Sequence, residues 1–103
     1  MKDDFAPAVY ILASARNGTL YVGTTSNLIR RVAQHRADHF DGFSSRYGTK
    51  TLVWFEMHAT MEQAILREKR IKKWNRAWKL KLIEEANSAW RDLATDLGFD
   101  ALR

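Results

Sequence analysis

The chain has 103 residues, a formal net charge of +5 at pH 7, 46% hydrophobic residues and no cysteine. This length predicts one domain, and the hydrophobic content indicates a folded globular chain. The lack of cysteine excludes disulfides and thiolate metal sites, and it favours a reducing, cytoplasmic setting. We expect no membrane association, because the sequence contains neither a long apolar run nor a recognisable signal peptide.

Two strands joined by a tight turn are the first predicted elements. Residues 8–12 and 20–23 are rich in β-branched and aromatic residues, and the Asn17-Gly18 pair between them accepts positive φ. The hairpin places Tyr10 and Tyr21 on neighbouring strands. A phenol can exchange protons or stack on a ligand, but two strand tyrosines are also ordinary packing residues.

A helix is predicted to follow from Leu28, after hydroxyl and amide side chains that can cap its first turn. At about 100° per residue, Arg31 and His35 share the side that Leu28 and Val32 bury, whereas Arg30 points nearly opposite. A buried guanidinium needs a partner, and it favours the neutral form of a neighbouring imidazole. Arg31 and His35 are therefore expected to border the core or a cleft beside it.

Residues 38–50 contain glycines, aromatic residues and cations, and they predict a long connection. Loops of this length in a small domain are often functional, so Arg46 and Lys50 are candidate phosphate contacts. An ordinary surface loop is the alternative. Residues 51–57 then form an almost continuous apolar run, which is typical of a third strand covered on its faces.

A second helix is predicted to begin near Met61, after a Thr-Met-Glu-Gln capping box. Glu68 falls in the middle of its apolar stripe of Met61, Ala64, Ile65 and Ile71. A carboxylate at such a position is costly unless it is paired, bound to a metal or placed at the floor of a cleft. The alternative to a functional site is a buried ion pair with a nearby cation, namely Arg31, Lys69 or Lys72.

Positive charge gathers in and after this helix. Residues 67–81 contain eight cations and a single acid, and the chain becomes more acidic afterwards. Such a block favours a polyanionic partner, although a solvated helix face is the alternative. The cations assigned to a nucleic-acid surface here are Lys69, Lys72, Lys73 and Arg76.

The end of the chain predicts two more helices. Asn75 can cap a helix whose pattern covers residues 77–86, and Asn87 is well placed to end it. Residues 90–97 predict a short last helix closed by Gly98.

Val9-Tyr10-Ile11 and Tyr21-Val22-Gly23 resemble the signature of the GIY-YIG nuclease superfamily, which includes the nuclease domain of the bacterial excinuclease C subunit. The likeness covers about residues 8–97 and is strongest to small single-domain bacterial proteins. The first motif differs from the signature in two ways, because Val9 replaces the first glycine and the order Tyr-Ile departs from the signature. It implies one α/β (α+β) domain over residues 1–103, with a three-stranded antiparallel sheet, its first strand in the middle, flanked by helices. The implied order is β-β-α-β-α-α plus a short C-terminal helix.

The resemblance also implies a metal-dependent endonuclease that hydrolyses DNA phosphodiester bonds, in repair or recombination. Glu68 would hold one Mg²⁺ or Mn²⁺, and Arg31 would stabilise the charge on the phosphate. Tyr10 would act as general base, which requires its pKa to fall near the cation and the metal. Tyr21 and His35 would position water and substrate.

The family's site asparagine maps onto Asn87, with Asn75 as the alternative. A plain capping role is an equally serious interpretation of either residue.

Two further hypotheses differ in class from the nuclease. One is a non-cleaving nucleic-acid-binding module of the same fold, and the other is an interaction subunit of a repair complex that uses exposed tryptophans as anchors. The joint presence of the five candidate residues Tyr10, Tyr21, Arg31, His35 and Glu68 favours cleavage. The small size favours binding alone, because a protein partner would have to supply specificity. The sequence leaves open DNA against RNA and the oligomeric state.

Overall fold

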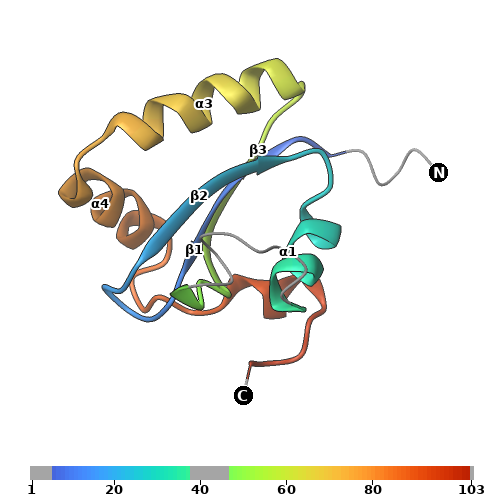
Figure 1. Cartoon of the computed structure of the whole chain (residues 1–103), viewed down its shortest axis with the longest axis vertical. Helices are drawn as coiled ribbons and strands as arrows, with labels where there is room; N and C mark the ends of the chain where they lie inside the picture. Colours follow the sequence, from blue (N-terminus) through green and yellow to red (C-terminus); the bar gives the residue numbers. More distant parts are fainter. Residues whose placement is uncertain (1–5, 38–46, 103) are drawn as a thin grey trace.

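The structure is a computed structural model that describes residues 6–37 and 47–102. Its elements, in order, are β1 (Ala8–Ala13), β2 (Leu20–Thr25), α1 (Leu28–Arg36), β3 (Thr51–Met57), α3 (Met61–Lys73), α4 (Arg76–Ala86) and the 3₁₀ helix η2 (Leu93–Leu97) (Figure 1). Within these two ranges, every helix is too short or too polar to cross a membrane. The predicted order of elements is confirmed.

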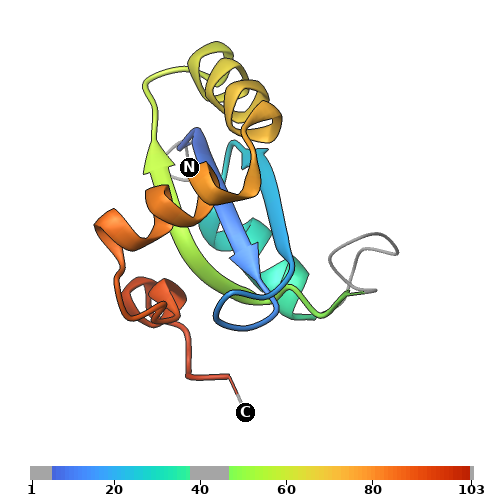
Figure 2. The same cartoon turned by 90° about the vertical axis from the view of Figure 1, so that its left-hand side faces the viewer.

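The three strands form one antiparallel sheet in the order β2-β1-β3 (Figure 2). The first strand therefore lies in the middle, as predicted. In this register Tyr10 stands opposite Gly23 on β2 and opposite Phe55 on β3. Because β2 is an outer strand, side chains that cross it reach the edge of the sheet.

The turn between β1 and β2 has the conformation that its sequence predicts. Asn17 has a φ of 59°, in the left-handed region that asparagine tolerates. The Gly18 N–H donates to the Ala15 carbonyl at 2.9 Å, and the Thr19 N–H donates to the Ser14 hydroxyl at 2.9 Å. The turn thus fixes the register of the two strands that carry Tyr10 and Tyr21.

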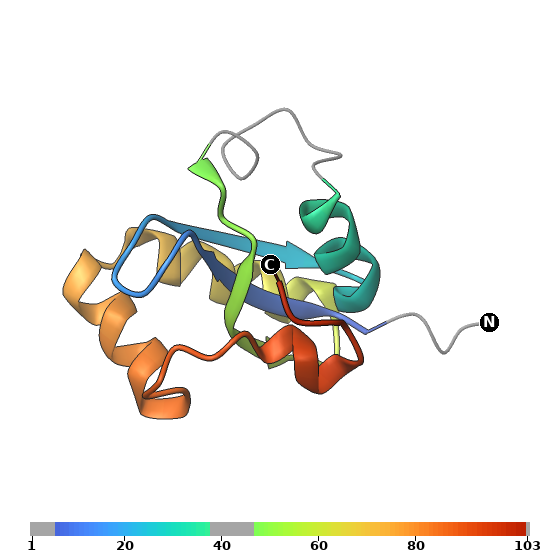
Figure 3. The ribbon, with the colours of Figure 1, turned by 90° about the horizontal axis from the view of Figure 1, so that it is seen from below.

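Both faces of β1 are covered, which explains its continuous apolar sequence. Val9 and Ile11 pack toward α3 and α4, in a core that includes Ala64, Ile71 and Ile83. The intervening residues of β1 pack on the opposite face, in a core under α1 and η2 that comprises Ala8, Tyr10, Leu12, Leu28, Val32, Leu52 and Ala94. Figure 3 looks onto the face covered by α1 and η2, with α3 beyond the strands.

The buried stripe of α3 is narrower than predicted. Ala64 and Ile71 are fully buried and Glu68 lies between them on the same side, as expected. The prediction that Ile65 belongs to the buried stripe is wrong, because its side chain is exposed. A stripe at i, i+4 and i+7 is sufficient here, since α3 lies along the edge strand of the sheet.

The last helix begins later than predicted. Trp90 has a φ of 57°, which no helix continues through, and the regular turn starts only after Asp92 accepts a hydrogen bond from the Ala94 N–H at 3.1 Å. The element is a 3₁₀ helix over Leu93–Leu97, and Gly98, with a φ of 101°, ends it as predicted.

Candidate active site

Tyr10 reaches the outer edge of the sheet because Gly23 leaves room for it. A Cβ atom on Gly23 would lie 2.6 Å from the Tyr10 hydroxyl and 2.7 Å from its Cζ atom, which is closer than atoms can approach. The phenol of the central strand therefore passes over β2 at the one position where no side chain obstructs it. The glycine of the signature has a steric function in this structure.

Three rings meet at this edge. The Tyr10 hydroxyl lies 3.2 Å from His35 Nε2, and both side chains are buried, with 0% of Tyr10 and 4% of His35 exposed. The Tyr21 ring centre lies 6.2 Å from that of Tyr10 and 5.3 Å from that of His35. The tyrosines of the hairpin and the histidine of α1 thus form one cluster, as the helical periodicity and the strand pairing indicate.

The environment of the cluster shifts the pKa values of two of its members, His35 and Tyr10. Burial, and then the Arg31 cation, lower the pKa of His35 from 6.5 to about 4, so the imidazole is neutral near pH 7, as predicted. Burial and the neighbouring Tyr21 raise the pKa of Tyr10, and this outweighs the lowering effect of Arg31. The fall in pKa expected for a phenolate base is therefore not produced by these side chains. Tyr10 is a neutral phenol whose hydroxyl lies within hydrogen-bonding distance of His35 Nε2.

The lowered pKa of His35 predicts a specific pH dependence of stability. The unfolded chain binds a proton at this imidazole below pH 6.5 and the folded protein only near pH 4, so His35 favours folding above pH 6.5 and this contribution is lost as pH falls to 4. At about 1.4 kcal/mol per tenfold change in proton affinity, it amounts to at most about 3.5 kcal/mol. The free energy of unfolding of His35→Gln, from urea titrations across this range, should depend less on pH than that of the wild type. Parallel profiles would contradict the prediction.

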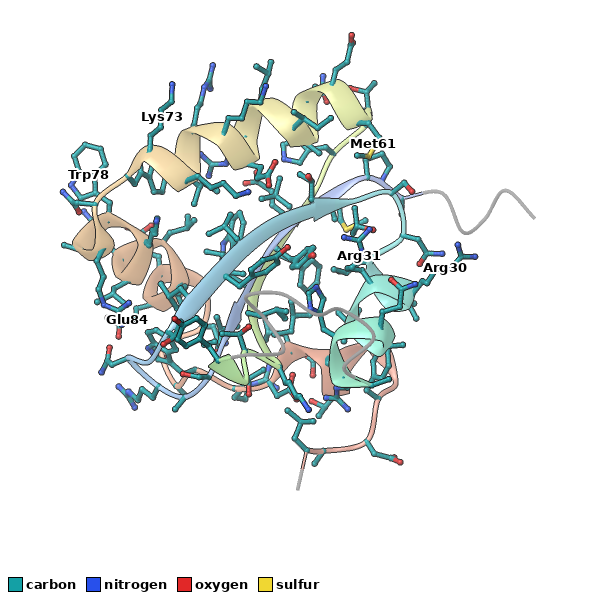
Figure 4. All side chains as sticks on the ribbon, in the orientation of Figure 1. Arg30, Arg31, Met61, Lys73, Trp78 and Glu84 are labelled. Carbon is teal, nitrogen blue, oxygen red and sulfur yellow. The ribbon has the colours of Figure 1, made fainter. Side chains whose placement is uncertain are left out.

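Arg31 and Arg30 point in different directions from the same turn of α1. In Figure 4, Arg31 lies between α1 and α3, whereas Arg30 extends away from the sheet. Arg30 is exposed and Arg31 is half-buried. Arg31 is close enough to the Tyr10 hydroxyl to lower its pKa through charge and hydrogen bonding. The prediction that Arg31 lies toward the core and Arg30 toward solvent is confirmed.

Glu68 comes to the same edge from α3, on the other face of the sheet. Its Oε1 atom accepts a hydrogen bond from the Thr24 hydroxyl at 3.2 Å, and its Oε2 atom lies 2.7 Å from Lys72 Nζ, with 14% of the side chain exposed. The ion pair with Lys72 weighed in the sequence analysis is thus present. Thr24 was missed, although strand alternation from Val22 places it on the face toward α3.

The donors around Glu68 suit one kind of metal ion. Within residues 6–37 and 47–102 there is no group of three histidine, cysteine, aspartate or glutamate side chains that a single ion would share. Mg²⁺ and Mn²⁺ accept one protein carboxylate and keep most of their water, whereas structural zinc requires more protein ligands. Oε1 accepts from Thr24 and Oε2 pairs with Lys72, and each of these carboxylate oxygens has a second lone pair. A single hydrated divalent cation therefore fits this side chain.

Asn87 lies at the other edge of the sheet. Its amide nitrogen donates to the Val53 carbonyl of β3 at 3.0 Å and to the Arg91 carbonyl at 2.9 Å, and its Oδ1 atom accepts from the Arg91 N–H at 3.0 Å. Asn75, the alternative, caps α4 through the Trp78 N–H at 2.9 Å. The structure brings neither asparagine to the cluster, and each side chain hydrogen-bonds to main chain.

The two asparagines are expected to differ in their contribution to stability. Asn87 is buried and makes three hydrogen bonds, so Asn87→Ala should lower the free energy of unfolding by about 2–4 kcal/mol. Asn75→Ala, which removes an exposed N-cap, should cost about 1 kcal/mol. Urea denaturation followed by tryptophan fluorescence measures both. Equal losses would contradict the structural role given to Asn87.

The cations assigned to nucleic acid do not share one environment. Arg76 donates to the carbonyl oxygens of Asn17 and Gly18, both at 2.7 Å, and so ties the start of α4 to the β1–β2 turn. Lys72 is 53% exposed and pairs with Glu68. Some of the cations in residues 67–81 therefore make contacts within the protein.

The other predicted phosphate contacts lie farther from the cluster or outside the described residues. Lys69 and Lys73 are exposed on α3, and Figure 4 shows Lys73 on the side that faces away from the sheet. Lys50 is half-buried just before β3. Arg46 lies outside the described residues.

The four tryptophans narrow the interaction hypothesis. Trp54 and Trp90 are buried in the core under α3 and α4, and Trp74 is partly buried against it. Trp78 is 57% exposed and packs edge-on against Trp74, with ring centres 5.9 Å apart. Among the four, Trp78 is the one available as a surface anchor.

Comparison with known proteins places this arrangement in a family. The family model described as "GIY-YIG catalytic domain" matches residues 6–81. A UPF0213 protein of Staphylococcus haemolyticus is 36% identical over 77 residues, which cover 75% of this chain and 93% of the relative. A UPF0213 protein of Clostridium perfringens is 37% identical over 75 residues, covering 73% of this chain and 80% of the relative.

A solved structure shows the same fold. The solution NMR structure of a UPF0213 protein from Bacillus halodurans matches with a TM-score of 0.55 and 24% identity, over 92% of this chain and 99% of that one. The tyrosine pair, Gly23 and the arginine and histidine of α1 all lie within the residues that the family model matches. The chain belongs to the GIY-YIG family, and its relatives are small UPF0213 proteins.

Proposed function

We propose that the protein is an endonuclease that hydrolyses phosphodiester bonds in DNA with one divalent cation, Mg²⁺ or Mn²⁺. The observation that carries the proposal is the convergence of Tyr10, Arg31, His35 and Glu68 at the edge of β2. These side chains come from β1, α1 and α3, so local packing within one element does not account for their meeting. Family membership supports the same reaction class.

Arg31 is the group that would bind the scissile phosphate. A guanidinium offers a planar fork of N–H donors that matches two phosphate oxygens, and it is always charged. Its half-buried position beside the Tyr10 hydroxyl limits screening by water. Negative charge that develops on the phosphate during attack would therefore be stabilised at Arg31.

Tyr10 and His35 would manage the proton of the attacking water. The Tyr10 oxygen accepts a proton from water while its own proton moves to His35 Nε2, 3.2 Å away. These two proton transfers require no free phenolate, which agrees with the raised pKa of Tyr10. A phosphate bound to Arg31 offsets the cation that lowers the pKa of His35, so proton acceptance becomes easier in the substrate complex.

Glu68 is the residue that would hold the cation, with Thr24 fixing the orientation of its carboxylate through the hydrogen bond to Oε1. When bound, the cation would polarise the phosphate and stabilise the leaving oxygen. The ammonium of Lys72 pairs with Oε2 of Glu68. Because Lys72 is 53% exposed, its side chain can turn into solvent when Glu68 binds a cation. No covalent enzyme intermediate is required.

The experiment that tests the function is cleavage of a labelled panel of single-stranded, duplex and branched DNA. Each substrate is incubated with Mg²⁺, with Mn²⁺ and with chelator, and an RNA of the same sequence is included. We expect cleavage with a divalent cation and none with chelator. Failure to cleave any substrate, with DNA binding retained, would contradict the nuclease.

The second candidate is a binding module of the same fold that does not cleave. The ion pair between Glu68 and Lys72 favours it, because the candidate metal ligand already has a cationic partner. The panel separates the two, since binding alone needs no divalent cation. A cytoplasmic role in DNA repair or recombination suits either function, with a protein partner that supplies specificity.

A further inference from the structure

A shallow pocket of about 260 Å³ lies beside the cluster on the same edge of the sheet. Leu20, Tyr21 and Val22 of β2 form its floor, and Lys72 of α3 and Lys79 of α4 form its walls. Tyr21 also packs against Tyr10 and His35, and Lys72 also pairs with Glu68. The pocket therefore shares Tyr21 with the cluster and Lys72 with Glu68.

Lys79 is unusual among the lysines of residues 67–81. It is half-buried, whereas Lys69, Lys73 and Lys81 are exposed. Within the two described ranges, no ion pair joins it to a carboxylate, although ion pairs involve Arg67, Lys72 and Arg91. An ammonium that is partly withdrawn from water without an acidic partner favours an anion beside it.

The position of the pocket along β2 suggests which anion this is. The Tyr10 hydroxyl crosses the strand at Gly23, and Leu20 lies three residues away, or about 10 Å at a rise of about 3.3 Å per residue. The pocket spans the interval between them. A strand whose scissile phosphate lies at Arg31 and continues along β2 would place a neighbouring phosphate between Lys72 and Lys79.

We propose that this pocket is a second phosphate subsite, in which Lys79 and Lys72 bind a phosphate of the same nucleic-acid strand next to the scissile one. The inference rests on the proposed function, because it takes the scissile phosphate to lie at Arg31. A cation bound to Glu68 would displace Lys72 Nζ, which lies 2.7 Å from Oε2, and Lys72 would then be available to the neighbouring phosphate. Occupation of the metal site and of the subsite would therefore support each other.

The subsite has a distinct kinetic signature. Lys79 contacts a phosphate that does not react, so it binds substrate and transition state equally, and its loss should raise KM and leave kcat unchanged. Lys79→Gln keeps the length of the side chain and removes its charge. We expect KM to rise about fivefold and kcat to stay within about twofold of the wild type.

Lys81→Gln is the matched control. It removes the same charge from the same helix, but Lys81 is exposed and lies about 200° around the helix from Lys79. Substrates with one uncharged methylphosphonate linkage beside the cleaved bond add a second test. The neutral linkage should weaken substrate binding by the wild type and by Lys81→Gln at one position, and this loss should be smaller in Lys79→Gln, which keeps only Lys72 at the subsite.

Binding measured without cleavage separates failure of the subsite from failure of the nuclease. Anisotropy of a labelled oligonucleotide in chelator, across a range of salt, should give a log–log slope reduced by about 1 in Lys79→Gln but not in Lys81→Gln. If the wild type does not cleave but this difference in slope appears, the nuclease proposal is wrong and the phosphate contact stands. If the two lysine variants behave alike in cleavage and binding, the subsite is wrong, whatever the protein cleaves.

Discussion

Glu68→Gln is expected to abolish metal-dependent cleavage of DNA, with a loss in kcat of at least about a thousandfold. Glutamine keeps an oxygen that can accept the hydrogen bond from Thr24, so the side chain retains its orientation. It removes the charge that would hold a divalent cation, and the described residues supply no group of three acidic, histidine or cysteine side chains in its place. The folded structure should persist, since the partner Lys72 is 53% exposed and becomes solvated.

Glu62→Gln is the matched control for this change. It lies on the same helix, in the first turn, and is exposed, so its cleavage rate should match that of the wild type. Broadening of NMR signals by Mn²⁺ gives a readout that is independent of activity. Residues near Glu68 and Thr24 should broaden in the wild type and in Glu62→Gln, and not in Glu68→Gln. Cleavage retained by Glu68→Gln would contradict the metal assignment.

Arg31→Ala should lower kcat by about a hundred- to a thousandfold, because it removes the cation placed beside the Tyr10 hydroxyl. The neighbouring Arg30→Ala removes the same charge from an exposed position on the same turn, and it should change kcat by less than about threefold. Single-turnover cleavage of one labelled duplex compares the two. Similar losses in both variants would mean that only total charge matters.

The same pair of variants has a spectroscopic test. Arg31 contributes to the lowered pKa of His35, so Arg31→Ala should raise the pKa of His35 from about 4, while burial still keeps it below 6.5. Arg30→Ala should leave it unchanged. Titration of the His35 ring signals by NMR measures this in folded protein without substrate, and it would separate a local effect from unfolding.

The basis of the candidate active site is visible in local sequence patterns. The four-residue spacing of Arg31 and His35 places both on one side of α1, and the position of Glu68 among the apolar residues of α3 places a carboxylate toward the sheet. The Asn17-Gly18 turn pairs the two tyrosine strands. These inferences succeed because helical and strand periodicity fixes the direction of each side chain relative to its own element.

Tertiary packing alone decided the distances between elements. That Tyr10 crosses β2 depends on the register that places it opposite Gly23. That Thr24 becomes a partner of Glu68 depends on how α3 lies along the edge strand, whereas the pairing with Lys72 follows from its i+4 position on the same helix. Periodicity contains no information on the contact between Thr24 and Glu68, because it joins residues whose relative position is set only when the faces of the sheet are covered.

Asn87 and Tyr10 also show what local sequence patterns do not contain. The position of Asn87 at the end of a helix is readable from the sequence, and two of its hydrogen bonds join it to Arg91, four residues on. Its hydrogen bond to the Val53 carbonyl of β3 follows only from the long-range packing of α4. The raised pKa of Tyr10 likewise comes from complete burial under α1, which no local pattern contains. The sequence by itself thus determined which face of each element carries the candidate site residues. Only the assembled sheet, with helices on both faces, decided which of those groups meet, because contact energy and burial arise between elements.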